Sequence, residues 1–425
     1  MVRRKSFFCL LIVFFLTIYS GQALKCQSDR NIKGVVYDAK TGEYMPYASI
    51  GLKNFSIGTI SNEKGEFEFY VPASSLNDTL VIAYVGYKSF EVPLKKAGEK
   101  IKVTLQPVAI AIDELYVYPL SPEEYIKRAM RRVKENYALH PFRTMAYFQE
   151  EVRENGQLIT GGEAIVKSYY PEYSDTVRNQ HQLLLYRETE EIHELSFMKD
   201  WRDKAERKEK KKALRKGEEA DPEEDDKNFM GLGGPETLLH FSILKQSDAF
   251  LDSNNFNRFT YLFGEGRFYR GKNLISIHFN ARRAVDNFKE NGTIFIDPDS
   301  YAIVFIESNG RAIIPVAVRP ILLALGLGLR DPVFNRTIKY EPYKGTYYPK
   351  DFHWNASVHL TKRHVFKKDE HSHIEAGQLF LINEVNTEKA IPIPEEYLFD
   401  PKKKMEEQVH NEDNVSWEGM NILKK

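Results

Sequence analysis

Histidines in the last quarter of the chain form the cluster whose residue types best suit a metal ion. The cluster consists of His364, His371 and His373, flanked by His353, His359, Glu370 and Glu375. A zinc site needs three or four nitrogen, oxygen or sulfur ligands, and two histidines spaced two apart share a face if they lie on a strand. The same stretch carries cations that would repel a metal ion, namely Arg363, Lys367 and Lys368. We therefore expect a polar loop here and assign no metal ligand.

Motifs for other chemistries are absent from the sequence. There is no Gly-x-Ser-x-Gly elbow for a serine nucleophile and no Gly-x-x-x-x-Gly-Lys-Ser/Thr loop for a phosphate. The glycine-rich stretch Gly231–Pro235 ends in proline and is interpreted as a flexible join. Asp297 and Asp299 could coordinate calcium, but an Asp-Pro-Asp-Ser turn between two strands needs no metal. No carboxylate pair stands out, so we expect no enzyme, no catalytic residue and no cofactor.

Composition limits the class of protein further. The 425 residues carry 60 Lys and Arg against 60 Asp and Glu, so no basic field favours nucleic acid. Cys9 lies in the apolar run near the N-terminus that is expected to be removed as a signal, and Cys26 is then alone, so the mature core must be held by packing rather than by disulfides. The 24 Tyr and 27 Phe favour an aromatic core rich in β-strands.

The segment from Ile32 to Leu105 consists of short strands separated by turns. Phe67, Phe69 and Val71 alternate with polar or amphipathic neighbours, which is the pattern of a strand with one buried face. Asp38–Glu43 and Ser61–Gly65 hold the Asp, Asn and Gly that turns favour. About seven strands at this spacing predict an antiparallel sandwich.

The same segment resembles a known module. The motifs are Gly34-Val35-Val36-Tyr37-Asp38, Thr41-Gly42-Glu43, Pro46-Tyr47-Ala48-Ser49-Ile50, Gly58-Thr59, Ser61-Asn62-Glu63-Lys64-Gly65-Glu66-Phe67 and Tyr84-Val85-Gly86-Tyr87. In this order they resemble the carboxypeptidase regulatory-like domain of Bacteroidetes envelope proteins. The resemblance implies a transthyretin-like β-sandwich without peptidase chemistry, and Ile112–Val117 resembles the strand that follows the module.

The rest of the chain is predicted to be an α+β domain with an antiparallel curved sheet. Ser121–Tyr137 has a serine cap, a proline in its first turn and an apolar stripe, as an amphipathic helix requires. Strands are expected in Thr144–Glu151, Leu158–Lys167, Tyr347–Leu360 and Gln378–Val385, and Arg258–Ser308 is expected to be a β-meander. The meander is similar in shape to periplasmic lipoprotein carriers, and the helix with the strands after it resembles an envelope family of unknown function. The fold class is therefore mainly β.

Five regions follow from these patterns. They are a signal peptide at 1–23, the sandwich at 31–106, a connecting helix at 107–140, and a β-rich domain at 141–425 that contains a charged insertion at 199–228. The insertion has almost no apolar residues and is expected to be a mobile segment or a projecting helix. Ile313–Leu329 is the most apolar later stretch. We expect it to be a buried core segment, with a surface-seeking segment as the alternative.

The N-terminus predicts export. Arg3, Arg4 and Lys5 precede an uncharged apolar run from Phe7 to about Tyr19, and Gly21 and Ala23 supply the small residues before a cleavage site. The run is shorter than the roughly 20 residues that cross a bilayer. Lipidation of Cys26 is an alternative, although Lys25 stands where a small residue is expected. We predict a location in the periplasm or outer membrane of a Gram-negative bacterium.

Three functional hypotheses remain open from the sequence. The first is a non-catalytic envelope protein with an interaction or scaffold role for a protein partner. The second is a carrier of a lipid or another apolar ligand, with Ile313–Leu329 as lid or core. The third is an unrecognised metal-dependent hydrolase that would depend on His371 or His373. None involves nucleic acid, and peripheral contact with a membrane is compatible with the first two.

Overall fold

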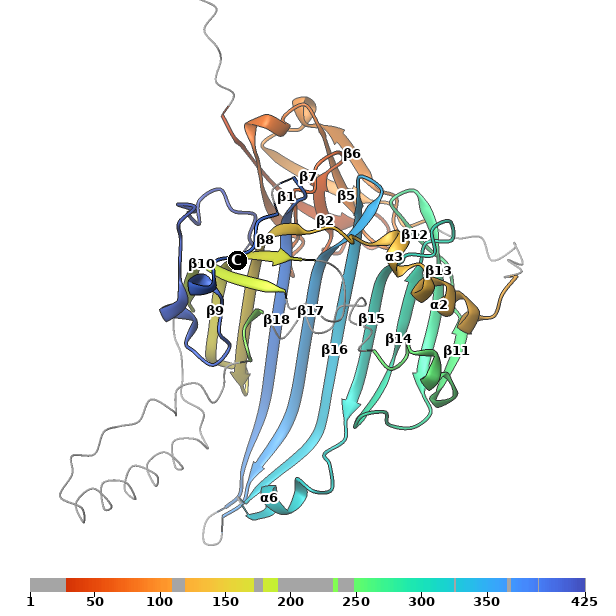
Figure 1. Ribbon diagram of the computed structural model, residues 1–425, viewed down its shortest axis with the longest axis vertical. Coiled ribbons are helices and arrows are strands. Elements are labelled where there is room, and N and C mark those ends of the chain that lie inside the picture. Colours follow the sequence, from red (N-terminus) through yellow and green to blue (C-terminus); the bar gives the residue numbers. More distant parts are fainter. Residues whose placement is uncertain are drawn as a thin grey trace, which may run out of the picture.

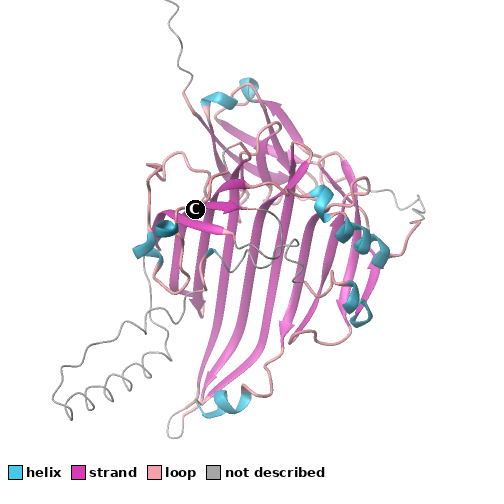
Figure 2. Ribbon diagram, in the orientation of Figure 1, coloured by secondary structure: helices cyan, strands magenta, loops and turns pink. Residues whose placement is uncertain are grey.

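The computed structural model describes residues 28–108, 119–171, 179–189, 232–235, 248–324, 326–364, 368–388 and 390–424. The expected signal peptide at 1–23, the charged insertion at 199–228 and the Ile112–Val117 strand lie outside these residues. Strands dominate what is described (Figure 2), and the predicted class, mainly β with a sandwich and an antiparallel curved sheet, is confirmed.

The N-terminal strands form a two-sheet sandwich, drawn in red and orange in Figure 1. One sheet has the order β4 (Glu66–Val71), β1 (Arg30–Asp38) and β7 (Lys100–Leu105), and the other has the order β3 (Gly58–Ile60), β2 (Ser49–Leu52), β5 (Thr79–Ala83) and β6 (Phe90–Pro93). Phe67, Phe69 and Val71 are fully buried between the sheets, as their alternation predicts.

The remaining strands form a single large sheet of eleven strands. Its order is β10 (Gln180–Glu188), β9 (Gln157–Tyr170), β8 (Phe142–Glu154), β18 (Glu370–Asn386), β17 (Thr346–Lys362), β16 (Leu327–Tyr343), β15 (Ile303–Ala312), β14 (Phe288–Ile296), β13 (Lys272–Ala281) and β11 (Phe259–Phe263), with β12 (Arg267–Tyr269) paired to β13. All of these pairs are antiparallel. β16, β17 and β18 have 17 residues each and extend well beyond their neighbours at one end (Figure 1).

The connecting helix is shorter than predicted. The expected helix Ser121–Tyr137 is divided into α2 (Pro122–Arg131) and α3 (Val133–Asn136), because Arg132 leaves the helical region with φ −91° and ψ 7°. The predicted cap is present, since the backbone N–H of Glu124 donates to the Ser121 hydroxyl. Tyr125, Ile126 and Ala129 are buried and form part of the core on one face of the large sheet.

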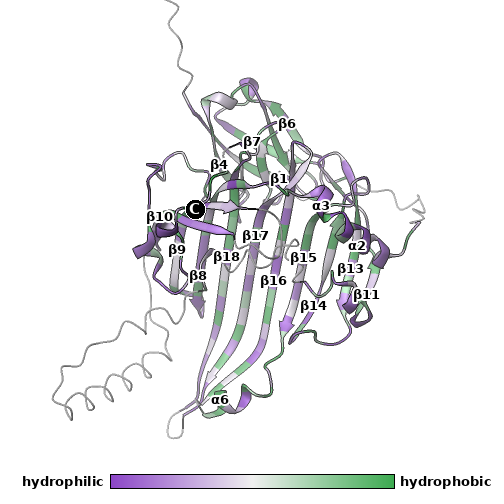
Figure 3. Cartoon of the chain, in the orientation of Figure 1, coloured by the Kyte–Doolittle hydropathy of each residue, from purple (hydrophilic) through white to green (hydrophobic). Residues whose placement is uncertain are grey.

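The two faces of the large sheet differ in chemistry. On one face, large apolar side chains from β13 to β18 join α2 and residues 249–259 in a continuous core. Phe250, for example, stacks on Phe279 with ring centroids 3.9 Å apart. On the other face the sandwich covers one end, and mainly polar side chains line the surface from there along the strands. Hydrophilic and hydrophobic residues are interspersed along these strands (Figure 3). An antiparallel sheet can keep one face wet in this way.

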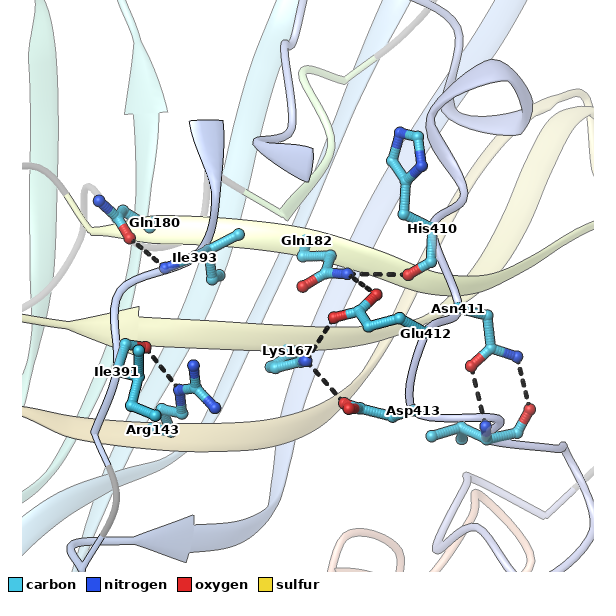
Figure 4. Close-up of polar contacts among 11 residues, drawn as sticks. Arg143, Lys167, Gln180, Gln182, Ile391, Ile393, His410, Asn411, Glu412 and Asp413 are labelled. Atoms are coloured by element: carbon cyan, nitrogen blue, oxygen red, sulfur yellow. Dashed lines mark hydrogen bonds and ion pairs between the residues drawn. The ribbon is translucent and has the colours of Figure 1, made fainter. Parts of the chain in front are cut away.

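Residues 390–424 form a C-terminal strap along the edge of the large sheet. The backbone N–H groups of Phe399 and His410 donate to the carbonyls of His181 and Leu183 on the edge strand β10. The Lys167 ammonium, 9% exposed, lies 2.8 Å from Glu412 and 2.6 Å from Asp413 (Figure 4). The strap thereby covers backbone groups that an open edge strand would present to other chains.

The expectation for Ile313–Leu329 is wrong. None of the residues of α6 (Arg319–Ala324) is buried, and the segment lies at the free end of the long strands, beyond the layers that form the core (Figure 1). Burial needs a second layer, and at this end of the sheet the segment is itself the outermost element. No described helix is long and apolar enough to cross a membrane.

Candidate functional site

Four histidines of the predicted cluster lie on strands, His353 and His359 on β17 and His371 and His373 on β18, whereas His364 lies beyond the end of β17. His359 on β17 pairs with His373 on β18, with their rings 4.6 Å apart, and His371 contacts the Thr361 hydroxyl at 3.1 Å. His364 contacts Glu370 separately at 3.0 Å. Within the described residues, no three His, Cys, Asp or Glu side chains are arranged to hold a metal ion.

The carboxylates of the Asp297–Asp299 turn contact side chains of the same chain. The Lys272 ammonium lies 2.7 Å from Asp297 and 3.2 Å from Asp299, and the Tyr347 hydroxyl donates to Asp297 at 2.9 Å. Burial would raise the pKa of Asp297, but the hydrogen bond from Lys272 and the backbone N–H of Asp299 lower it. A lysine thus occupies the position that a calcium ion would need.

The sandwich is docked on the large sheet through a buried cluster of charges. Glu341 accepts hydrogen bonds from the Ser49 hydroxyl at 2.6 Å, the Arg270 guanidinium at 2.9 Å and the Tyr269 hydroxyl at 3.1 Å. Burial acts to raise the pKa of Glu341, but the charges of Arg270 and Lys350 outweigh it and bring the pKa to about 2. The carboxylate is therefore ionised at the point where the two domains meet.

A second set of polar contacts lies within the large sheet, next to the charge cluster. Lys350 on β17 is 5% exposed and donates to the Ile382 carbonyl at 3.0 Å. Burial lowers its pKa. Lys339 and Asp351, both buried, form an ion pair at 3.2 Å. These contacts join β16, β17 and β18 where the sandwich docks, and the Ser56 hydroxyl of the sandwich donates to the Val385 carbonyl on β18 at 2.8 Å.

Beside this cluster the two domains enclose a cavity of about 610 Å³, within the range typical of ligand sites. The sandwich contributes Tyr47, Tyr84 and Tyr87, and the sheet contributes a registered row of side chains: His278, Thr293, Glu307, Thr337 and His353. Burial lowers the pKa of His353 and raises that of Glu307. Charged side chains of both signs, Glu265, Arg267, Lys339 and Asp351, complete the lining, so the cavity offers hydrogen-bonding groups and aromatic rings beside a few charges.

The next row on the same face consists of asparagines. Asn280 pairs with Asn291, Asn291 with Asn309, Asn309 with Asn335, and Asn335 with Asn355. Directly paired residues of antiparallel strands point to the same face. At about 4.8 Å between strands, the five side-chain amides extend over roughly 19 Å. We call Asn280, Asn291, Asn309, Asn335 and Asn355 the asparagine row.

The asparagine row is largely open to solvent. Four of its residues are exposed and Asn355 is partly buried; the Asn355 amide donates to the Asn335 carbonyl oxygen at 3.3 Å. The row lines a groove of about 800 Å³. Charged residues of both signs border this groove: Lys289, Arg311, Arg153, Glu151, Glu375 and Glu63. Cavity and groove therefore form one polar surface that begins under the sandwich.

Sequence reasoning missed the asparagine row, although part of its signal was present. Asn291, Asn335 and Asn355 each stand two residues before a Thr or Ser, and residues two apart share a face of a strand. The residue types alone do not give the register of five strands, which is what aligns the amides.

One comparison with known proteins, against family models, identifies the N-terminal module. The CarboxypepD_reg-like domain family matches residues 32–117, which extends past the predicted boundary at residue 106. A search of curated proteins found no match to the chain.

Solved structures that resemble the chain do so weakly. One is a domain from Vibrio parahaemolyticus assigned to outer-membrane lipoprotein sorting, with 8% identity and a TM-score of 0.25 over 64% of this chain and 95% of that chain. A DUF1329 family protein from Desulfovibrio piger has 6% identity and a TM-score of 0.24 over 64% and 96% of the two chains. Lipovitellin has 12% identity and a TM-score of 0.23 over 60% and 26%. Such TM-scores are too low to transfer a function.

The sequence motifs, the two-sheet sandwich and the family match thus coincide on the same residues. Residues 32–117 of this chain are a carboxypeptidase regulatory-like domain.

Proposed function

We propose that this chain is a non-catalytic binding protein of a bacterial envelope, and that the asparagine row with the adjoining cavity binds a hydroxyl-rich ligand of the glycan class. The export part of the proposal rests on the basic, apolar and small-residue segments of 1–23. The binding part rests on the cavity between the two domains and on the groove that the asparagine row lines.

The asparagine row is the observation that carries the proposal. Asparagine is depleted in β-strands, where Thr, Tyr and β-branched residues fit better, and a solvated face needs no particular polar side chain. Five asparagines paired in register therefore indicate a role other than stabilising the strands. On the same face, the residues two positions away along the strands are of mixed type: His278, Arg282, Lys289, Thr293, Glu307, Arg311, Val333, Thr337, His353 and Ser357.

The chemistry of the amide suggests the ligand. A side-chain amide both donates and accepts hydrogen bonds, as does a hydroxyl group, so a row of amides matches a chain of sugar hydroxyls without needing a charge on the ligand. Tyr47, Tyr84 and Tyr87 at the cavity add rings with an apolar body and a polar tip. Sugar rings have the same combination of apolar faces and polar edges.

The lipid-carrier and hydrolase hypotheses remain alternatives with separate tests. The apolar face of the sheet is packed by protein side chains in its described part, as with Phe250 on Phe279, whereas a lipid needs an apolar cavity. For the hydrolase, loss of a measured hydrolytic activity in His371→Ala or His373→Ala would be the supporting result.

Calorimetric titration of the full chain with soluble oligosaccharides from peptidoglycan and from lipopolysaccharide core tests the proposal. The informative variant is the double substitution Asn309→Ala/Asn335→Ala. Loss of two hydrogen bonds at about 0.5–1.5 kcal/mol each predicts affinity roughly tenfold weaker or more, since 1.4 kcal/mol is a factor of ten. The matched control is Asn254→Ala/Asn273→Ala, which removes two exposed asparagines outside the row.

The expected result is binding of at least one oligosaccharide by the wild type and the control, with weakened binding by the row variant. Equal affinities for all three proteins, or no binding by the wild type to either class of oligosaccharide, would overturn the proposal.

A further inference from the structure

The free end of the long strands carries a group of exposed apolar side chains. Their exposed fractions are 37% for Ile313, 75% for Val316, 37% for Val318, 59% for Ile321 and 64% for Leu323. We call these five residues the apolar tip. Single exposed apolar residues are common on protein surfaces, but a contiguous group of them marks an interaction site.

The apolar tip is an ordered part of the fold. The backbone N–H of Ile313 donates to the Asn287 carbonyl at 2.7 Å, and that of Arg363 donates to the Gly326 carbonyl at 2.7 Å. Within the tip, Leu322 donates to Val318 at 3.1 Å. These bonds tie the segment to the loop before β14 and to the end of β17, so the apolar side chains are held outward rather than folded onto the sheet.

Basic residues surround the apolar tip. The described residues of 311–333 and 359–370 contain three acidic side chains, Asp331, Asp369 and Glu370, and six basic ones, Arg311, Arg319, Arg330, Lys362, Arg363 and Lys368. Six basic side chains against three acidic ones leave a net positive charge in these two ranges. The surroundings of the tip are therefore positively charged.

We propose that the apolar tip docks on an anionic lipid surface. Exposed aliphatic side chains with a basic border are the combination that enters the interface of a membrane, where the apolar atoms leave water and the cations meet lipid phosphates. A helix of six residues such as α6 is about 9 Å long, which suits shallow insertion and not crossing. The charge complementarity distinguishes this occupant from a second copy of the chain, whose tip would bring the same positive charge.

This docking would set the orientation of the molecule. The tip and the sandwich lie at opposite ends of β16, β17 and β18 (Figure 1), and 17 extended residues span up to roughly 55 Å. The cavity between the domains would thus face away from the lipid surface, where a soluble ligand can reach it. The docking itself does not depend on the ligand proposed above.

Flotation of the full chain with vesicles tests the proposal. The vesicles contain either phosphatidylcholine alone or phosphatidylcholine with about one third phosphatidylglycerol. The informative variant is Ile321→Ser/Leu323→Ser. The control is Leu262→Ser/Ile391→Ser, which removes two apolar side chains of similar exposure, 62% and 61%, away from the tip. Circular dichroism verifies that each variant is folded.

We expect the wild type and the control to float with the anionic vesicles, and the tip variant to bind at least tenfold more weakly. Binding should also weaken at high salt, because salt screens the attraction between cations and lipid phosphates. Equal flotation of tip variant and control, or no flotation with anionic vesicles, would overturn the proposal. A dimer in light scattering that is lost only in the tip variant, without flotation, would assign the surface to self-association instead.

Discussion

Arg336 lies on the apolar face of the large sheet and is 5% exposed. Its guanidinium forms ion pairs with Asp248 at 2.5 Å and Glu290 at 2.8 Å, and it donates to the Ser308 hydroxyl at 3.0 Å. Burial raises the pKa of Glu290, and the charge of Arg336 opposes that shift. The arginine thus supplies the positive charge with which both carboxylates pair.

Arg336→Met is expected to destabilise the protein by about 3–5 kcal/mol, the usual effect of removing one partner of a buried ion pair. The shift of the urea unfolding curve measures it. The exposed Arg283 is the matched control, and Arg283→Met should leave the curve within about 0.5 kcal/mol. Similar curves for the two variants would show that the buried cluster does not stabilise the sheet.

Gly58 allows the closest approach of the sandwich to the sheet. A Cβ atom there would lie 2.6 Å from the Lys350 ammonium and 2.7 Å from the Ile50 carbonyl oxygen. Since the second contact is with backbone, Gly58→Ala should destabilise by about 1–3 kcal/mol, measured as a lower thermal midpoint. Gly328→Ala is the control, because its nearest neighbour would be at 3.6 Å; an equal midpoint for the two variants would contradict this explanation.

The candidate site could be predicted only in part from residue types. The histidines were conspicuous in sequence, yet His364 and Glu370 form a separate contact from the His359 and His373 pair. The asparagines stand at separations of 11 to 26 residues, and only strand register brings them into line. Register depends on bulges such as the one between Arg330 and Val333, which residue types do not reveal.

At the scale of elements, the strand pattern of the sandwich was predictable because each short strand alternates and each turn has its characteristic residues. The predicted single helix Ser121–Tyr137 is interrupted at Arg132. After the interruption, Asn136 and Tyr137 donate hydrogen bonds to the carbonyls of Ser300 and Ile303, and such contacts between distant segments have no local sequence pattern. Ile313–Leu329 was misassigned because apolar composition predicts burial only where another layer is present to cover it.

Glu341, near the end of β16, should make the stability of the protein depend on pH. Its folded pKa of about 2 lies below the ordinary value of 4.5, so the stabilisation is complete above pH 4.5 and is lost as the pH falls toward 2. The difference corresponds to about 3 kcal/mol. Glu341→Gln should therefore show a flatter dependence of stability on pH between 4.5 and 2 than the wild type.

The matching control for this acid titration is Glu396→Gln, an exposed carboxyl in the strap. Its stability profile should follow that of the wild type across the same range. If Glu341→Gln follows it as well, the charge cluster does not link the sandwich to the sheet in the way proposed here.

For the molecule as a whole, the C-terminal strap joins three parts that are remote in sequence. It covers the edge of β10, packs Trp417 under the Arg187 guanidinium at 4.2 Å, and reaches the sandwich, where Asn421 exchanges hydrogen bonds of 2.8 and 3.1 Å with the Tyr70 backbone. That this strap docks on its own chain could not be predicted from the sequence, because no local pattern records contacts 351 residues apart.

Lys167→Met is expected to loosen the strap, since it removes the cation between Glu412 and Asp413. Hydrogen exchange should become faster at residues 409–424, while β13–β15, on the far side of the sheet, should stay unchanged. Faster exchange throughout the sheet would instead indicate that Lys167 stabilises the fold generally.

The central claim, that the polar face of the large sheet binds a glycan, is tested most directly by native mass spectrometry of the chain purified gently from its own envelope. The wild type should retain an added mass that fragments into sugar units, and Asn309→Ala/Asn335→Ala should lose it. No sugar mass on the wild type, or a sugar mass that the double variant keeps, would contradict the claim.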